Sequence, residues 1–402
     1  MGLPCPARCR TGKTGARLVT LDCVRVFLAL LLPFACAPLS PAAPRASNPS
    51  ARPVIAGYVF PDGASLQPGQ IDAHAMTRIN YAFANIKDGE VVLGYPQDDA
   101  NLKLLTALRQ QNPALEILLS VGGWSWSAHF SDAALTDQSR QVFIESALGL
   151  IQRYQLDGLD IDWEYPDQAG AGNVHRREDT VNFTLLMQGL RERLDAAQKT
   201  LHRRLYLTIA AEASDEYLRK TEMDKVQSYV DAINLMAYDY YMPGSDRIAG
   251  NFAPLHVSAS DPKHVSAAAS VQAYEKAGVP AAKIVLGVPF YGRAWRDVDD
   301  SNHGLFQHGK GGPDAYISYD RIARTMLGHG FNGYWDGASS APYLYNPEQR
   351  VFVSYEDPQS LAAKCGYVLK SKLAGIMFWD YSDDSSGTLL RALRRGLMNP
   401  GP

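Results

Sequence analysis

The sequence predicts a (β/α)8 barrel of the TIM type with a small α+β insertion between strands 7 and 8. From residue 54 to residue 398, short apolar runs alternate with longer segments of helical periodicity. No glycine-rich phosphate loop follows the first run, which disfavours the competing doubly wound sheet. About ninety residues separate the seventh run from the eighth, far more than an ordinary connection needs.

The predicted strands are short runs bounded by polar or turn-forming residues. They span Val54 to Phe60, Arg78 to Ile86, Glu116 to Val121, Gly158 to Trp163, Leu205 to Ala211, Ala232 to Tyr238, Lys283 to Val288 and Gly375 to Trp379. The helices predicted between them include Leu102 to Gln111, Gln138 to Tyr154, Thr180 to Lys199, Ala267 to Ala277 and Gln359 to Lys370. The chain is 46% hydrophobic, enough for one large core over 54–398.

The long segment 295–355 is rich in glycine, aspartate and tyrosine and contains β-forming runs such as Tyr343 to Tyr345 and Val351 to Val353. We expect it to fold as the α+β insertion within the barrel.

The first residues have the organisation of an export signal. Five basic residues and one acid precede an apolar run from Val26 to Ala37. This run is too short to span a bilayer, which needs about twenty residues, but it suits a secretory signal. We expect residues 1–37 to be a signal peptide, 38–53 a Pro/Ala-rich linker, and the mature protein to be extracellular or periplasmic and without a membrane segment.

Composition narrows the classes of partner. Four of the five cysteines lie in the leader, so the single remaining Cys365 cannot form an internal disulfide. A net charge of -3 argues against a nucleic-acid partner. Nine scattered histidines show no metal-ligand spacing, so we expect no metal and no cofactor. We expect a monomer.

The most informative stretch runs from Leu156 to Pro166, where Asp160, Asp162 and Glu164 alternate with apolar residues. On a strand, this spacing places the three acids on one face with Cα atoms roughly 6.6 Å apart. Carboxylates that close cannot all ionise, so at least one pKa rises and that group can act as a general acid. A calcium loop would use glycine and polar residues between its ligands. Asp157 lies outside the alternation and is predicted to be structural.

This stretch resembles the Asp-x-x-Asp-x-Asp-x-Glu signature of the family 18 glycoside hydrolases, the chitinases and their relatives. Four further segments resemble motifs of the same family: Ser120 to Trp124, Met236 to Asp239, Pro289 to Arg293 and Phe378 to Trp379. The resemblance covers roughly Val54 to Leu397.

The resemblance implies a substrate-assisted mechanism, in which the substrate's own acetamido oxygen replaces an enzyme nucleophile. Glu164 would be the acid and base. Asp162 would bind the acetamido group, with Asp160 behind it, Tyr238 donating to the activated oxygen, and Asp239 shaping the pocket.

Residues at the carboxyl ends of barrel strands are expected to bind substrate. They are Trp379 as the floor beneath the sugar, Met236, Trp124, Tyr58, Phe83, Ser120, Tyr291, Arg293 and Glu212. Ser120 is interpreted as a partner of the acids, since no histidine is paired with it in the sequence. Among the other tryptophans, Trp126 and Trp295 are candidates for flanking subsites, Trp163 is expected in the core, and Trp335 is left open.

We therefore expect a secreted chitinase that cuts β-1,4 bonds between N-acetylglucosamine units with retention, acting on chitin or N-acetylglucosamine oligosaccharides. The alternatives are an endo-N-acetylglucosaminidase acting on glycoprotein glycans or peptidoglycan, and a chitin-binding lectin. Two departures from the common family pattern, Glu212 and the segment Tyr240 to Met242, leave the leaving-side subsites open.

Overall fold

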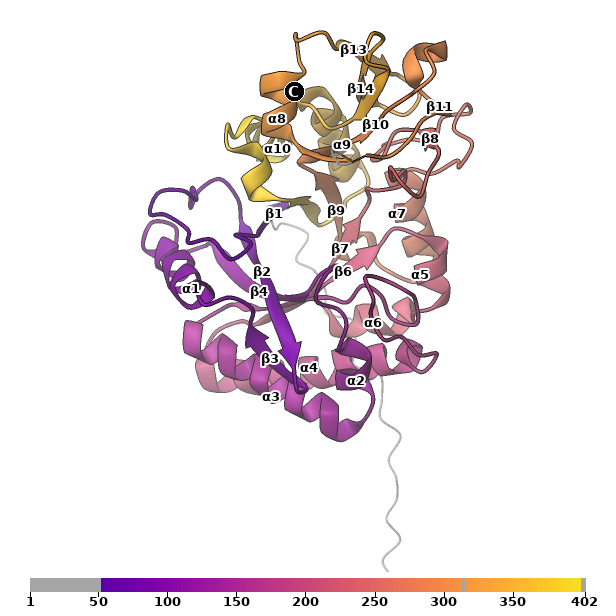
Figure 1. Ribbon diagram of the computed structural model, residues 1–402. Coiled ribbons are helices and arrows are strands. Elements are labelled where there is room, and N and C mark those ends of the chain that lie inside the picture. Colours follow the sequence, from indigo (N-terminus) through magenta and orange to yellow (C-terminus); the bar gives the residue numbers. More distant parts are fainter. Residues whose placement is uncertain (1–51, 313–314, 399–402) are drawn as a thin grey trace, which may run out of the picture. The chain divides into compact units, whose positions relative to one another are not determined.

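The computed structural model describes residues 52–312 and 315–398 (Figure 1). The predicted signal peptide, and the predicted linker up to residue 51, lie outside these residues. The fold class is confirmed. Eight parallel strands in the order β1-β16-β9-β7-β6-β5-β4-β2 close into a barrel, because β1 also pairs with β2. The barrel strands are β1 (Val54–Val59), β2 (Arg78–Lys87), β4 (Glu116–Gly122), β5 (Gly158–Asp162), β6 (Tyr206–Glu212), β7 (Ala232–Met236), β9 (Ile284–Pro289) and β16 (Gly375–Trp379).

Each predicted strand overlaps an observed one, and the largest difference at a strand end is two residues, at the end of β7. There the chain turns sharply, since the amide of Ala237 donates to the carbonyl of Leu235 at 2.8 Å and that of Tyr238 donates to Met236 at 2.9 Å. This turn terminates the pairing of β7 with its neighbouring strands. A short strand that was not predicted, β3 (Glu90–Leu93), pairs antiparallel with the end of β2.

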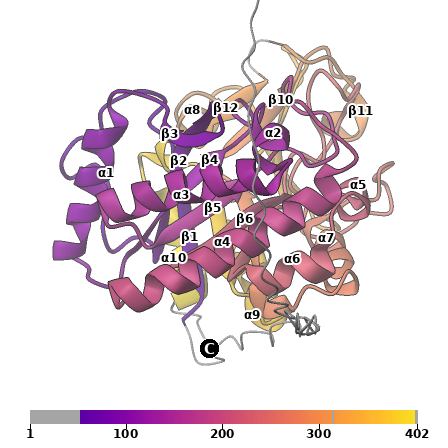
Figure 2. The same ribbon diagram turned by 90° about the horizontal axis from the view of Figure 1, so that it is seen from below.

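The helices between the strands cover the outside of the barrel, with α3 and α4 side by side (Figure 2). Their bounds are α1 (Asp98–Ala107), α2 (Phe130–Ala134), α3 (Asp137–Tyr154), α4 (Asp179–Leu201), α5 (Asp215–Arg219), α6 (Met223–Tyr229), α7 (Ala267–Lys276), α9 (Pro358–Lys370) and α10 (Thr388–Met398). Of these, α2, α5, α6 and α10 were not predicted. Capping boxes at Thr136 and Asp357 begin α3 and α9.

The first helix begins four residues before its predicted start. The carboxylate of Asp98 accepts hydrogen bonds from the amides of Gly94 and Tyr95 at 2.9 and 2.8 Å, which fixes the chain at that point. The predicted end is also corrected, because residues Leu108–Gln110 form a 3-10 turn instead of continuing the α-helix.

Between β9 and β16 the chain forms the insertion as a separate antiparallel sheet with strand order β12-β10-β15-β14-β13. Its elements are β10 (Tyr291–Trp295), β12 (Tyr316–Ser318), α8 (Tyr319–Thr325), β13 (Asn332–Asp336), β14 (Ala341–Asn346) and β15 (Val351–Ser354). β11 (Gln307–His308) pairs instead with β8 (Ile248–Ala249). Trp295, Tyr343 and Phe352, from three strands of this sheet, belong to one buried cluster.

Apolar residues on the outward faces of the barrel strands pack against the helices. Trp163, just after β5, lies between Phe130 at 5.2 Å and Phe183 at 5.8 Å between ring centroids. Burial of such large side chains is the main force that holds the helices to the barrel. Within the described residues, no helix has both the length and the apolar character needed to cross a bilayer.

Candidate active site

Asp160 lies inside the barrel and is fully buried, yet both of its carboxylate oxygens are occupied. Tyr58 and Ser120 donate to Oδ2 at 2.7 and 2.8 Å. Thr208 and Asn234 donate to Oδ1 at 2.5 and 2.9 Å. Four neutral donors from four different strands stabilise the negative charge of this carboxylate without an arginine or a lysine.

Asp162, two residues further along β5, has the opposite surroundings. It is 4% exposed, and its Oδ1 has no hydrogen-bond partner in the described structure. Burial raises the pKa of Asp162 well above its ordinary value, and the negative charges of Glu164 and Asp160 raise it further. A buried acceptor without a donor costs free energy, so this oxygen is ready to accept a hydrogen bond from a ligand.

Glu164 follows the last residue of the strand and is held by its backbone. Its amide donates to the hydroxyl of Ser127 at 2.9 Å, and that hydroxyl lies 3.1 Å from the carbonyl of Asp162. Burial raises the pKa of Glu164 to about 7, with further contributions from the negative charges of Glu212 and Asp239. A large fraction of Glu164 is therefore protonated at neutral pH, as a general acid requires.

Two glycines allow the neighbouring strand to approach these acids. At Gly122, φ is 105°, and a Cβ atom would lie 2.3 Å from the carbonyl oxygen of Asp162. At Gly123, φ is 75°, and a Cβ atom would lie 2.6 Å from the ring of Phe83. Only glycine fits both the backbone conformation and the space, which gives a physical reason for the glycine pair in the segment Ser120 to Trp124.

Tyr238 and Asp239 lie just beyond β7. Burial raises the pKa of Tyr238 well above its usual range, as do the negative charges of Asp162, Asp239 and Glu164, so its hydroxyl remains a donor. Asp239 accepts hydrogen bonds from two residues that we predicted to contact sugar. Tyr291 donates to its Oδ2 at 2.8 Å, and Arg293 donates to both oxygens at 2.8 and 2.7 Å.

Aromatic rings form the opposite wall of the barrel mouth. Trp379 stacks on Phe83 at 5.6 Å between centroids with 17° between the ring planes, and Tyr58 lies 5.6 Å from the same indole. Phe60, which was not predicted, also lies 5.6 Å from Trp379. Met236 packs against this cluster. Such rings can stack against the C–H faces of a pyranose.

The other tryptophans divide between the mouth and the core. Trp124 is 54% exposed and lies 6.4 Å from the ring of Tyr165. Trp126 packs against Tyr95 at 5.2 Å. Trp295 was a candidate for a flanking subsite, but it is completely buried in the insertion and its indole N–H donates to the carbonyl of Asp246. The prediction was wrong for Trp295, because a side chain in the core cannot contact sugar.

Sequence reasoning missed three residues that contact the acids: Thr208, Asn234 and Ser127. For the first two a signal exists, since each is a polar residue in the middle of an apolar strand. Such a residue must satisfy its hydrogen bonds inside the barrel. Ser127 lies in the loop after β4, where no periodicity marks it.

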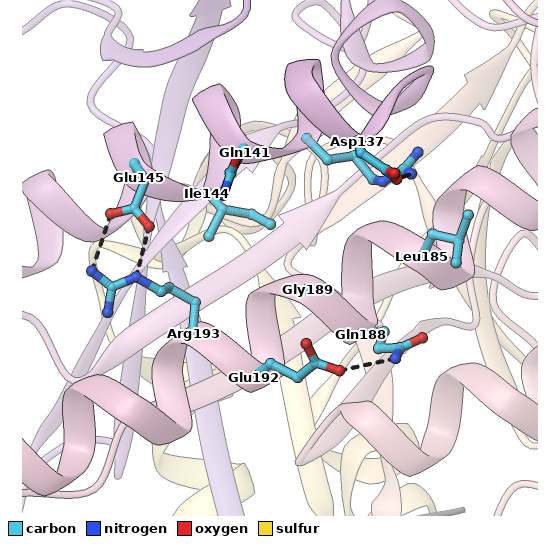
Figure 3. Close-up of a pocket in the computed structure, with 10 residues that line it drawn as sticks. Asp137, Gln141, Ile144, Glu145, Leu185, Gln188, Gly189, Glu192 and Arg193 are labelled. Atoms are coloured by element: carbon cyan, nitrogen blue, oxygen red, sulfur yellow. Dashed lines mark hydrogen bonds and ion pairs between the residues drawn. The ribbon is translucent and has the colours of Figure 1, made fainter. Parts of the chain in front are cut away.

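The outer surface of the barrel also has a hollow, separate from the barrel mouth. This hollow of about 500 Å³ lies between α3 and α4, lined by Ile144, Leu185 and charged side chains (Figure 3). Its charges compensate one another, as in the pair between Arg193 and Glu145 at 2.6 Å. None of the β5 acids reaches it. In 52–312 and 315–398, no cluster of histidine, cysteine or acidic side chains is arranged to hold a metal ion.

The arrangement at the barrel mouth combines an acid with a raised pKa, a second buried carboxyl group with an unpartnered oxygen, a phenol donor and an aromatic floor. The model of the glycosyl hydrolases family 18 matches residues 54–384, which include all of these groups. The chain belongs to glycosyl hydrolase family 18. The resemblance inferred from the acidic motif is thereby confirmed, and the carboxylates of β5 lie at the mouth of a family 18 barrel.

Individual family members show how far the likeness extends. Chitinase A1 of Niallia circulans is 35% identical over 86% of this chain and 59% of its own length. Chitinase ChiW of Paenibacillus sp. str. FPU-7 is 38% identical with a TM-score of 0.82, over 86% of this chain and 33% of that one. A family 18 N-acetylglucosaminidase from Paenibacillus barengoltzii is 41% identical with a TM-score of 0.78, over 86% of this chain and all of that one.

The chain thus spans about three fifths of the first of these proteins and a third of the second.

Proposed function

We propose that this protein is a chitinase that hydrolyses β-1,4 bonds between N-acetylglucosamine units with retention of configuration. The observation that carries the proposal is the buried Oδ1 of Asp162, which has no partner among the described residues and lies beside the acid Glu164. The acetamido N–H of a sugar stacked on Trp379 would supply the missing donor.

In the proposed reaction, Glu164 gives its proton to the glycosidic oxygen as the bond from that oxygen to the anomeric carbon breaks. The acetamido carbonyl oxygen forms a new bond to the anomeric carbon, which creates a positively charged oxazolinium ring. Water then attacks the anomeric carbon from the side of the departed group, returns a proton to Glu164 and reopens the ring. Two inversions give net retention.

The electrostatics of the site fit this sequence. Asp162 lacks a cationic partner in the described structure, so the positive charge that develops on the acetamido group provides one only as the reaction proceeds. Interactions that strengthen in the transition state lower the barrier. The hydroxyl of Tyr238, kept protonated by its surroundings, donates to the carbonyl oxygen under attack. Tyr291 and Arg293 donate to Asp239 and so position it.

The names of the relatives support chitin as the substrate and also provide a second candidate. The Niallia circulans protein is a chitinase, whereas the Paenibacillus barengoltzii enzyme is an N-acetylglucosaminidase. Both activities cleave bonds of N-acetylglucosamine, and they differ in whether the product is an oligosaccharide or the single sugar. We also propose that the protein is exported and acts as a monomer, as the sequence predicts.

The test is hydrolysis of defined N-acetylglucosamine oligomers by the wild-type protein and by Glu164→Gln, with products and anomers followed over time. Rapid release of the β-anomeric disaccharide by wild type alone is expected. Release of the monosaccharide would favour the N-acetylglucosaminidase. Binding without cleavage by the wild type would overturn the proposal in favour of a lectin or of an enzyme acting on glycoprotein glycans or peptidoglycan.

A further inference from the structure

Glu212, the last residue of β6, is an additional acid beside the site. Its carboxylate accepts a hydrogen bond from the hydroxyl of Ser214 at 2.7 Å and forms no ion pair within the described part of the chain. Burial raises the pKa of Glu212, and the nearby charge of Glu216 raises it further. A partly buried carboxylate with one neutral donor has room for a cationic partner.

The lysine and arginine side chains nearest this part of the mouth pair with groups other than Glu212. Lys263, which lines the same hollow, pairs with Asp246 at 2.7 Å. Lys220 donates to the carbonyl of Asp167 at 2.7 Å, and Arg293 is held by Asp239. His264 also lines the hollow and makes no ion pair with Glu212. Glu212 therefore adds uncompensated negative charge to a mouth that already holds several acids.

The position of Glu212 places it on the leaving side of the proposed cleavage point. In the closed ring of eight strands, β5 with Glu164 lies opposite β16 with Trp379, and β6 is the neighbour of β5. The sugar that reacts lies on Trp379, so the sugar that departs from the oxygen protonated by Glu164 lies towards β5 and its two neighbours, β4 and β6. Glu212 on β6 is close enough for its negative charge to act on Glu164. A hollow of about 440 Å³ there is lined by Glu212, Tyr238 and Asp239.

We propose that Glu212 makes the leaving-side subsite selective for a cationic sugar, so that the enzyme prefers bonds in which the departing residue is a glucosamine with a free amino group. This inference rests on the proposed function. The ammonium group of a deacetylated residue would supply the cationic partner that Glu212 lacks, whereas the sugar on Trp379 must keep its acetyl group to react. The preferred substrate class is then partially deacetylated chitin.

The experiment compares two trisaccharides that carry N-acetylglucosamine at the first two positions and differ only at the reducing end, where one has glucosamine and the other N-acetylglucosamine. Release of the reducing-end sugar is followed in mildly acidic buffer of low ionic strength. We expect wild type to show a kcat/KM about fivefold higher for the glucosamine-ended substrate, a size typical of a partly exposed charge pair. Added salt should reduce this ratio.

In Glu212→Gln the ratio should fall to about one. Because both rates come from the same variant, any general loss of activity cancels. Glu192→Gln is the matched control, since it removes one negative charge from the outer surface of α4, away from the barrel mouth, and should keep the wild-type ratio. Equal rates in wild type, or a preference that survives in Glu212→Gln, would overturn this inference alone. If wild type cuts neither trisaccharide, both this inference and the proposed chitinase activity are overturned.

Discussion

At the amino end of β5, Asp157 contacts two arginines, whereas at the carboxyl end Asp162 and Glu164 contact no cation in the described structure. Asp157 pairs with Arg109 and Arg203 and accepts the amide of Ile117 at 2.8 Å. At the other end, burial and neighbouring acids raise the pKa values of Asp162 and Glu164. The segment around β5 thus has one carboxylate that ion pairs stabilise and two acidic side chains that lack a cationic partner among the described residues.

The midpoint of the strand gives an intermediate case. Asp160 has no cation but four neutral donors, so its charge is satisfied by dipoles. Along one strand, the surroundings change from ion pairs to hydrogen bonds and then to an unpartnered oxygen. Buried residues that lack an ionic or hydrogen-bond partner destabilise the free protein, and they are concentrated at sites where a ligand supplies that partner.

The largest expected effect is at the carboxyl end. Asp162→Asn should lower kcat on N-acetylglucosamine oligomers by about 10²- to 10³-fold, because the oxazolinium charge loses its counter-ion. The free energy of unfolding should stay level or increase, since a destabilised carboxylate is removed. Steady-state kinetics and urea denaturation of the same preparation measure both. A kcat within twofold of wild type would remove Asp162 from the mechanism.

At the amino end of β5 we expect the opposite result, a loss of stability with little change in kcat. Asp157→Asn should lower the free energy of unfolding by about 1–3 kcal/mol, because two partly buried arginines lose their partner. Its kcat should remain near the wild-type value, since Asp157 lies at the end of the strand away from the mouth. An unchanged unfolding midpoint in urea would contradict the structural role of Asp157.

A smaller effect on stability is expected at Glu164. Its pKa in the folded protein, about 7, is above the ordinary value, so its stabilising contribution is complete below that ordinary value and is lost as the pH rises through 7. Glu164→Gln should therefore raise the free energy of unfolding at about pH 8 by on the order of 1 kcal/mol and change it little at about pH 4. Thermal unfolding at the two pH values tests this; equal shifts would argue against the raised pKa.

The smallest expected effect is a shift of the pH profile. The general acid must be protonated, so kcat/KM should decline as the pH rises through about 7. Because the negative charge of Glu212 raises the pKa of Glu164, Glu212→Gln should move this decline to lower pH by a few tenths of a unit, on the order expected for a partly screened charge. A decline that moved to higher pH would mean that the charge of Glu212 does not act on Glu164.

The sequence predicted the acids of β5 because alternation along a strand is a local property. Asp160, Asp162 and Glu164 all prove to be buried, and Trp163 is buried among aromatic rings on the other face. The barrel was predictable for the same reason, since each strand and helix carries its own periodicity. The start of α1 was missed because the hydrogen bonds that Asp98 accepts from the amides of Gly94 and Tyr95, rather than apolar spacing, fix the chain where that helix begins.

The barrel, its insertion and the positions of the acids could be predicted from local patterns, because they depend on residues near one another in the chain. Which of the carboxylates has hydrogen-bond partners depends on contacts between distant segments. Tyr58 and Asn234 reach Asp160 across 102 and 74 residues of sequence, and Arg293 reaches Asp239 across 54. Such contacts depend on barrel closure and strand register, which no local pattern encodes. The burial that raises the pKa of Glu164 has the same origin, since a carboxylate loses water only when the strands and loops around it have assembled.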